Sequence, residues 1–153
     1  RFRYVPPTTP QDAWEVTCLL VQPTSDIVAT DFDGDGKLEI LTFSKFHGDT
    51  LAIWHEGQTR DRYEQVWCDP QKRSFLHALW AADLNGEKCA VIGNRKDGRD
   101  LLLVRYVDGQ YTVDVIDHDL GPANCMVYRH DGSDYIVAAY RETDQLALYK
   151  VVE

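Results

Sequence analysis

Apolar residues in this chain fall into short runs separated by turn residues, and the pattern repeats. Residues 29–57, 81–109 and 127–153 can be laid over one another so that Gly34, Gly86 and Gly132 coincide, with offsets of 52 and 46 residues by subtraction. Self-similarity at such a period indicates a repeat architecture, and these offsets are close to the length of a β-propeller blade. The chain is therefore expected to be built from three copies of one unit.

Each copy is expected to be an antiparallel meander. A first strand ends near the aligned glycine, and the Asn85-Gly86, Asp108-Gly109 and Asp131-Gly132 pairs supply the turns that tight hairpins need. Each third strand follows an aspartate: Asp49, Asp100 or Asp144. Second strands are predicted at 38–44, 88–94 and 134–140, third strands at 50–55, 101–106 and 145–150, and fourth strands at 63–68 and 111–116.

The third copy ends after its third strand, while Trp14 to Leu20 carries the aromatic-then-apolar pattern of a fourth strand. Propellers commonly close when the first strand completes the last blade, because closure removes an exposed edge. The prediction is an all-β fold: a β-propeller of four-stranded antiparallel blades, with three blade equivalents in this chain. A single unit over 1–153 would comprise an outer strand of a closing blade (14–22), a blade with a calcium loop (26–70), a second blade (75–118) and an incomplete third blade (123–153).

Three blades are too few to close a ring, since propellers have about four to eight. A partner is therefore expected, either a second copy of the chain that makes a six-bladed ring or a missing part of a larger propeller. The symmetric dimer is the favoured alternative.

The loop from Asp31 to Glu39 carries the clearest local signal. Asp31, Asp33, Asp35 and Glu39 place carboxylates at positions 1, 3, 5 and 9, and the carbonyl of Lys37 falls at position 7. Hard cations such as calcium bind six to eight oxygen ligands in this manner. An EF-hand also needs an acid at position 12, where Thr42 stands, and flanking helices. The loop is instead expected to connect two strands.

A carboxylate loop followed by an apolar strand, in units of blade length, resembles the FG-GAP or VCBS repeat of calcium-binding β-propellers. The resemblance covers nearly the whole chain and implies that Asp31, Asp33, Asp35, Lys37 (carbonyl) and Glu39 are the ligands of one structural Ca²⁺ per chain. The equivalent turns at Asp83 to Gly86 and Arg129 to Gly132 have lost most of the acids.

Polar residues at strand ends suggest a second site, because strand-terminal loops often carry function. His77, His47, Arg95 and Arg141 are candidates for a proton-transfer and anion-stabilising cluster, as a carbohydrate lyase or dehydratase would need. The favoured hypothesis is a binding or scaffold domain for carbohydrate or protein, and the lyase or dehydratase is the alternative. In a binding domain, Trp54, Trp67 and Trp80 would offer flat faces to the ligand, unless they pack in the core. His55, His118 and His130 are interpreted as surface or satisfied histidines.

The net charge of −9 argues against nucleic acid as the main partner, since phosphate backbones are bound by clustered Lys and Arg. No run of apolar residues is long enough for a membrane span. Cys18, Cys68, Cys89 and Cys125 lack zinc-type spacing and are interpreted as buried, reduced thiols. The compartment stays open: the resemblance favours an extracellular protein, and the apparently unpaired cysteines favour the cytoplasm.

Overall fold

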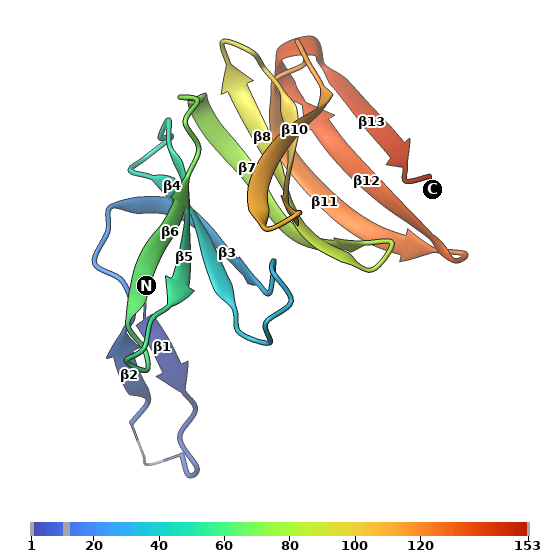
Figure 1. Ribbon diagram of the computed structural model, residues 1–153. Coiled ribbons are helices and arrows are strands. Elements are labelled where there is room, and N and C mark those ends of the chain that lie inside the picture. The colour runs from blue at the N-terminus through green and yellow to red at the C-terminus, as the bar shows by residue number, and fades with distance from the viewer. Residues whose placement is uncertain (1, 11–12, 153) are drawn as a thin grey trace.

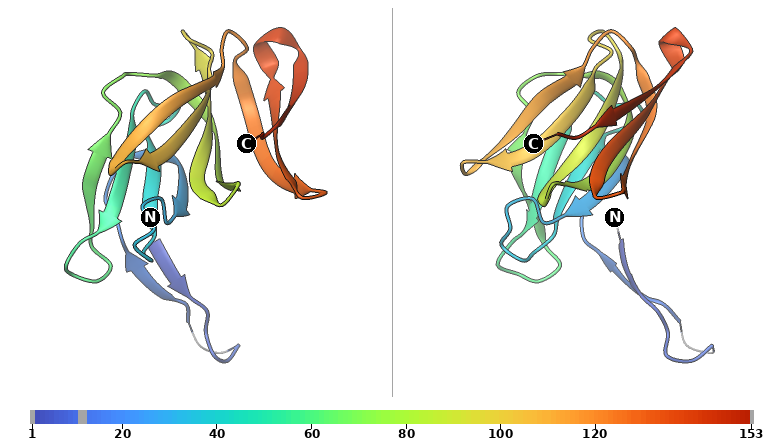
Figure 2. Two further views of the ribbon diagram at one scale, coloured as in Figure 1. Left: turned by 45° about the vertical axis from the view of Figure 1, so that its right-hand side comes forward. Right: turned by 90° about the vertical axis from the view of Figure 1, so that its right-hand side faces the viewer.

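The computed structural model describes residues 2–10 and 13–152, and over these residues the protein is all-β (Figures 1 and 2). A single turn of 3₁₀ helix, Arg141–Thr143, is the one helical segment in this part of the chain. The strands are β1 (Phe2–Val5), β2 (Glu15–Cys18), β3 (Thr24–Thr30), β4 (Glu39–Ser44), β5 (Leu51–Glu56), β6 (Tyr63–Cys68), β7 (Ser74–Leu84), β8 (Glu87–Lys96), β9 (Leu101–Val107), β10 (Gln110–Asp117), β11 (Pro122–His130), β12 (Ser133–Tyr140) and β13 (Gln145–Lys150).

Three sheets follow one another along the chain, each an antiparallel meander. The first has the order β3-β4-β5-β6, the second β7-β8-β9-β10 and the third β11-β12-β13, while β1 and β2 form a separate two-stranded sheet. These sheets lie over the residue ranges expected for the three units, and the second, third and fourth strands lie close to their predicted positions. Turn chemistry explains part of this agreement, because Asn85 (φ 52°) and Gly86 (φ 87°) adopt the left-handed conformation that the predicted hairpin requires.

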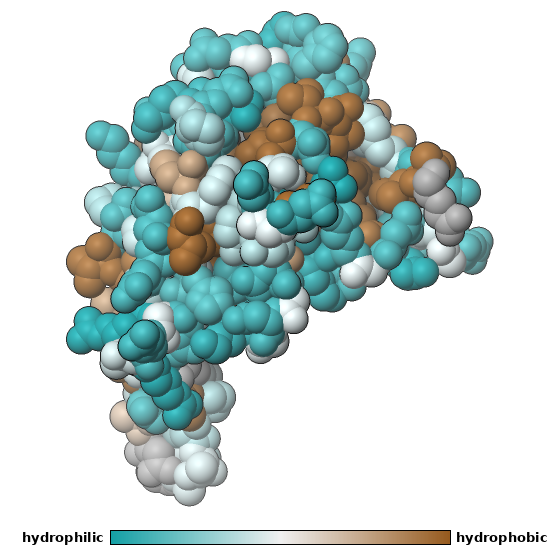
Figure 3. Space-filling model, in the orientation of Figure 1, coloured by the Kyte–Doolittle hydropathy of each residue, from teal (hydrophilic) through white to brown (hydrophobic). Residues whose placement is uncertain are grey.

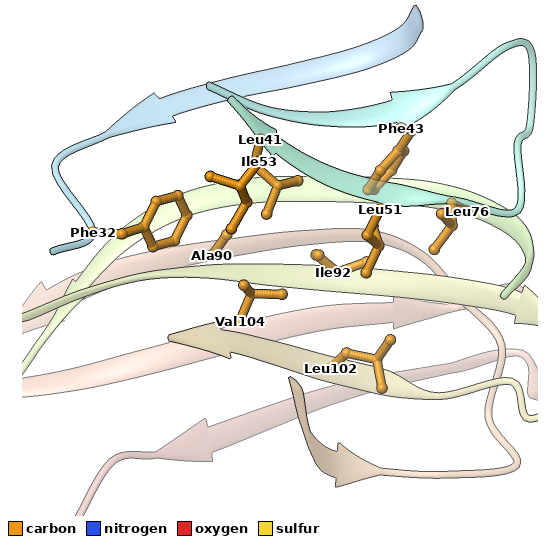
Figure 4. Packing of buried hydrophobic residues seen from close by; sticks show 10 residues of the cluster. All are labelled: Phe32, Leu41, Phe43, Leu51, Ile53, Leu76, Ala90, Ile92, Leu102 and Val104. Atoms are coloured by element: carbon orange, nitrogen blue, oxygen red, sulfur yellow. The ribbon is translucent and has the colours of Figure 1, made fainter. Parts of the chain in front are cut away.

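The sheets stack face to face through two apolar cores. In the first core, Leu41 and Ile53 of the first sheet meet Ala90 and Ile92 of the second (Figure 4). The other face of β8 enters the second core, where Val91 packs with residues of the third sheet. Because β8 is buried on both faces, its sequence is a continuous apolar run rather than an alternation of apolar and polar residues. Each fully buried aliphatic side chain contributes roughly 1.5–3 kcal/mol.

The first strand of every sheet carries a bulge at the same place in the repeat. The extra residue is Ser25 in β3, His77 in β7 and Ala123 in β11. Each lies nine residues before the aligned glycine by subtraction. Bulges of this kind bend a strand and redirect a side chain. The repeat is therefore present in the backbone irregularities as well as in the strand order.

Loops between second and third strands join each sheet to the next. The carbonyl of Gly48 accepts a hydrogen bond from Leu76 N (3.1 Å), and that of Gly98 accepts one from Asp119 N (3.1 Å). In both cases the donor belongs to the segment around the start of the next sheet's first strand. β7 lies against both β3 and β11, so the first strands are neighbours in space. The sheets form a stack of consecutive units, and no closed ring is seen in the described chain.

The N-terminal strand pairs within this chain with a strand that the predicted repeat did not include. β2 lies within the predicted range 14–22, but it pairs with β1, Phe2 facing Cys18 and Val5 facing Glu15. Within this chain β2 does not complete the third sheet, which keeps three strands. β1 is much closer to β2 in sequence than any strand of the third sheet is, and short loops cost less conformational entropy to close. β1 itself has no counterpart in the predicted repeat.

The cysteines divide into two groups. Cys89 and Cys125 are buried in the core between the second and third sheets, and burial raises the pKa of each thiol to about 12. Cys18 and Cys68 are exposed, so the expectation that they are buried was wrong. Both are the last residues of strands at the edge of a sheet. All four are free thiols.

Candidate metal centre and cationic cluster

The loop between β3 and β4 is shaped by its own carboxylates. Asp33 Oδ1 accepts a hydrogen bond from Asp35 N (3.1 Å), and Asp31 Oδ2 accepts one from Gly36 N (3.0 Å). Asp35 Oδ1 in turn accepts from Lys37 N (2.8 Å). Gly36 has φ 87°, a conformation that glycine adopts without steric cost. These short-range bonds hold the aspartates of a strongly anionic loop in one region.

Four side chains converge at the base of this loop. Asp33, Asp35, Glu39 and His55 each offer one ligand atom, and these atoms all lie within 4.8 Å of one another. Glu39 is fully buried; its Oε2 accepts a hydrogen bond from Phe32 N at 2.6 Å. Its Oε1 and Asp31 Oδ1 are buried without a hydrogen-bond partner among the described residues. A buried carboxylate oxygen without a partner is costly, so this arrangement favours a bound cation.

Local electrostatics fit the same interpretation. Burial, and after it the neighbouring charge of Asp33, raises the pKa of Glu39. The pKa of Asp35 is lowered, first by the hydrogen bond from the Lys37 amide. A positive charge placed here would relieve the repulsion among these acids.

His55 was missed as a member of this group by the sequence reasoning, which treated it as a surface or satisfied histidine. Its Nδ1 lies 2.8 Å from the Glu56 carbonyl, and its Nε2 lies 3.1 Å from Asp35 Oδ2 and 3.6 Å from Glu39 Oε1. A usable signal was present. Pairing of Ile40 with Trp54 in the β4–β5 hairpin brings the next pair, Glu39 and His55, opposite each other.

The predicted ligand set is thus partly gathered. Asp33, Asp35 and Glu39 belong to the four-residue group, whereas Asp31 and Lys37 lie in the same loop outside it. Asp31 nevertheless presents a buried oxygen without a partner.

A hollow lined by aromatic rings opens beside Asp33 and His55 of this group. Trp67, Tyr106 and Tyr111 also line it. The rings of Tyr106 and Tyr111 are 4.8 Å apart, and those of Trp67 and Tyr111 are 6.0 Å apart. Trp67 and both tyrosines also pack against the first core. Trp80, by contrast, is 41% exposed.

The second predicted site is assembled at the opposite end of β4. His47, in the β4–β5 loop, stacks on Phe75 (ring centroids 4.1 Å apart) and on His77 (5.1 Å). The guanidinium carbon of Arg95 and Lys96 Nζ lie 4.8 and 4.9 Å from the centre of the Phe75 ring. The structure therefore brings His47, His77 and Arg95 together, as the sequence predicted, and adds Lys96 and Phe75.

Arg141 stands apart from the ring stack. It is exposed in the 3₁₀ turn, and its neighbour Glu142 accepts a hydrogen bond from Arg95 Nη2 at 2.7 Å. That hydrogen bond is the main cause that lowers the pKa of Glu142. His77 corresponds in the repeat to Ala123, and each is the extra residue of the bulge in its strand.

Comparison with known proteins adds no relative: no family model and no curated protein matches this chain. Among the described residues, no helix has the length and apolarity required to cross a membrane.

Proposed function

We propose that the chain is a calcium-stabilised part of a β-propeller that acts as a binding or scaffold domain, with carbohydrate or protein as its ligand. The observation that carries the calcium proposal is that two buried carboxylate oxygens, Asp31 Oδ1 and Glu39 Oε1, accept no hydrogen bond among the described residues. Glu39 also belongs to the group that contains Asp33 and Asp35. Four carboxylates in one loop offer the hard oxygen donors that Ca²⁺ prefers, and the single imidazole of His55 is too few nitrogen ligands for a typical zinc site.

The propeller proposal is supported by three repeated features. The sheets are antiparallel meanders, their first strands are neighbours, and the second-to-third-strand loop of one sheet binds the segment around the start of the next sheet's first strand. The third sheet lacks a fourth strand and exposes Leu146 (75%) and Leu148 (58%) on β13. In Figure 3, brown apolar residues gather on the side where the third sheet lies. A further sheet packed there would remove this surface from water.

We infer that a second copy supplies the missing sheets, because the open face of the third sheet and the first sheet of another chain can repeat the contact seen between consecutive sheets. Two copies would give six blades, within the range of known rings. Sedimentation equilibrium should then give a mass of two chains, and Leu146→Lys with Leu148→Lys should give one. A wild-type monomer at about 50 μM would contradict the dimer and assign the remaining blades to another polypeptide.

Calcium binding is tested by titrating chelator-treated protein with Ca²⁺, Mg²⁺ and Zn²⁺ in a calorimeter. One Ca²⁺ should bind per chain, and calcium at 100 times its Kd should raise stability by about 2.7 kcal/mol. For a chain of this size that corresponds to a Tm increase of roughly 5–10 °C.

The matched variants are Glu39→Gln, which keeps the shape of the buried side chain, and Asp131→Asn, which removes one charge from the exposed turn of the third unit. Glu39→Gln should weaken calcium binding at least tenfold, and Asp131→Asn should leave it unchanged. Stoichiometric zinc binding without calcium binding would overturn the assignment.

A carbohydrate lyase or dehydratase is the alternative function, and the convergence of His47, His77 and Arg95 favours it. His77 Nδ1 faces the Ala123 carbonyl at 2.8 Å, so Nδ1 carries the proton and Nε2 is left as the site for proton transfer. Turnover of an acidic oligosaccharide, followed as new absorbance of an unsaturated product and lost in His77→Asn, would establish this function. Binding of the oligosaccharide without turnover would instead support the binding-domain function.

A further inference from the structure

The cluster at the end of β4 is a local concentration of positive charge in an acidic chain. The net charge is −9, yet the charged groups that act on His47 are His77, Arg95 and Lys96. Burial is the first cause that lowers the pKa of His47, and these like charges add to it. Within the described part of the chain, the carboxylate bonded to the cluster is that of Glu142, which is already paired with Arg95. The remaining positive charge of the cluster is therefore suited to an anionic ligand.

Backbone geometry at this place is unusual and points to a function. Phe75 has φ 62° and His47 has φ 46°. Left-handed conformations are disfavoured for residues with a bulky side chain. Two backbone hydrogen bonds hold them, from Leu76 N to the Gly48 carbonyl (3.1 Å) and from Arg73 N to the Asp49 carbonyl (2.8 Å). Strain that is held in place by surrounding structure is typical of binding sites.

The bulge at His77 serves the same arrangement. It redirects this side chain from the regular alternation of β7, and the bond to Ala123 fixes the ring. The imidazoles of His47 and His77 then lie nearly parallel, with an interplanar angle of 10°. Two stacked imidazoles beside an arginine and a lysine repel one another when protonated, and an anion bound at the edge of the cluster reduces that repulsion.

An apolar platform borders the charges. Phe46 is 82% exposed, and its ring lies 3.9 Å from that of His47. Exposed aromatic rings next to donors are suited to a ligand that combines a charged group with an apolar face. A simple inorganic ion would make no use of Phe46.

We propose that His47, His77, Arg95 and Lys96 bind the carboxylate of a sugar acid, whose ring lies against Phe46. Arg95 is held by Glu142, and Lys96 lies over the Phe75 ring, so both cations are oriented before the ligand binds. The proposal deepens the binding function proposed above by naming the ligand class, and it does not require the metal centre. A phosphate group shares the anion chemistry and is distinguished by experiment.

The test is calorimetric titration of the calcium-loaded protein with D-galacturonate, with neutral D-galactose and with inorganic phosphate. Galacturonate should bind at least tenfold more tightly than galactose and than phosphate. Phe46→Ala should weaken galacturonate binding about threefold or more and leave phosphate unaffected. Equal binding of phosphate and galacturonate would overturn the role of the ring, and equal binding of galactose would overturn the role of the charges.

The matched charge variants are Lys96→Gln, in the cluster, and Lys150→Gln, at the opposite end of the third sheet, where Lys150 pairs with Tyr135. Both residues are exposed, so neither change should disturb folding. Lys96→Gln should weaken galacturonate binding at least fivefold, and Lys150→Gln less than twofold. Equal effects would contradict the site. Calcium affinity, measured on the same variants, should be unchanged, so that loss of the sugar acid alone is separated from failure of the metal centre.

Discussion

The β3–β4 turn and the β7–β8 turn occupy equivalent places in the repeat, but they balance negative charge differently. Asp83 of the second turn lies 52 residues after Asp31 of the first, by subtraction. Lys88 Nζ donates to Asp83 Oδ2 at 2.5 Å, and Gly86 N donates to Asp83 Oδ1 at 2.8 Å. In the first turn no lysine fills this role, and Asp31 Oδ1 has no partner among the described residues.

This comparison shows why only one unit is expected to hold a cation. In the second turn the chain supplies its own positive charge, and in the third Arg129 stands at the aspartate position and lies 3.8 Å from Asp134. The first turn instead adds Asp33, Asp35 and the buried Glu39 to its aspartate. The single lysine of this turn, Lys37, offsets only part of that charge, so a cation from outside the loop is expected.

The largest effect is expected from removing two charges of the first turn in the double variant Asp33→Asn, Asp35→Asn. With 1 mM calcium, the variant should lose most of the calcium-dependent increase in Tm, about 5 °C or more. In a chelator it should be as stable as the wild type or more stable, because like charges no longer repel one another. Thermal unfolding followed by circular dichroism gives both values.

The decisive result is that the double variant is less stable than the wild type in calcium but equally or more stable in chelator. The same pair of changes in the third turn, Asp131→Asn with Asp134→Asn, is not a suitable control, because Asp134 is buried and bonded to Asn85. Asp131→Asn alone is suitable. A loss of stability of equal size in calcium and in chelator would mean that the aspartates only shape the loop.

A smaller effect is expected in the second turn from Lys88→Gln. Both partners of this ion pair are about half exposed, so the Tm should fall by less than about 2 °C. The Lys88 hydrogen bond is the first cause that lowers the pKa of Asp83. Its contribution is therefore present above the unfolded-state pKa of about 3.9 and is lost as the pH falls through the lower folded-state value.

Wild type and Lys88→Gln should accordingly differ at pH 6 and converge near pH 2, and 1 M salt should reduce the difference at pH 6. Thermal melts across this pH series provide the check. A difference that persists at pH 2 would show that the lysine acts through its aliphatic stem rather than through its charge.

Much of the fold was predictable because local signals agree with one another. The Asn-Gly and Asp-Gly turns set the hairpins, and the aligned glycines set the repeat. The partner of β2 was not predictable, because strand pairing depends on competition among edges that the strand pattern does not encode. The exposure of Cys18 and Cys68 follows from the same open edges.

The candidate sites were predictable where their residues are adjacent in sequence. Asp33 and Asp35 lie in one loop and Glu39 begins the strand that follows it, and these three side chains meet. His55 comes from the next strand and required the hairpin register. His47, His77 and Arg95 were proposed from their positions at strand ends, but the bulge and the left-handed Phe75 that bring them into a stack have no simple sequence signature.

The loop-to-strand hydrogen bonds at Gly48 and Gly98 affect how the molecule unfolds and how its repeats could have been duplicated. Each sheet is fixed mainly by its immediate neighbour, as in linear repeat arrays, so cooperativity is passed from unit to unit. The amides of Leu76 and Asp119 should exchange with solvent only when two adjacent sheets separate. The smallest unit that unfolds locally is then a sheet together with the loop that bonds to the next sheet. A gene duplication that adds one repeat would have to include the same loop to keep this contact.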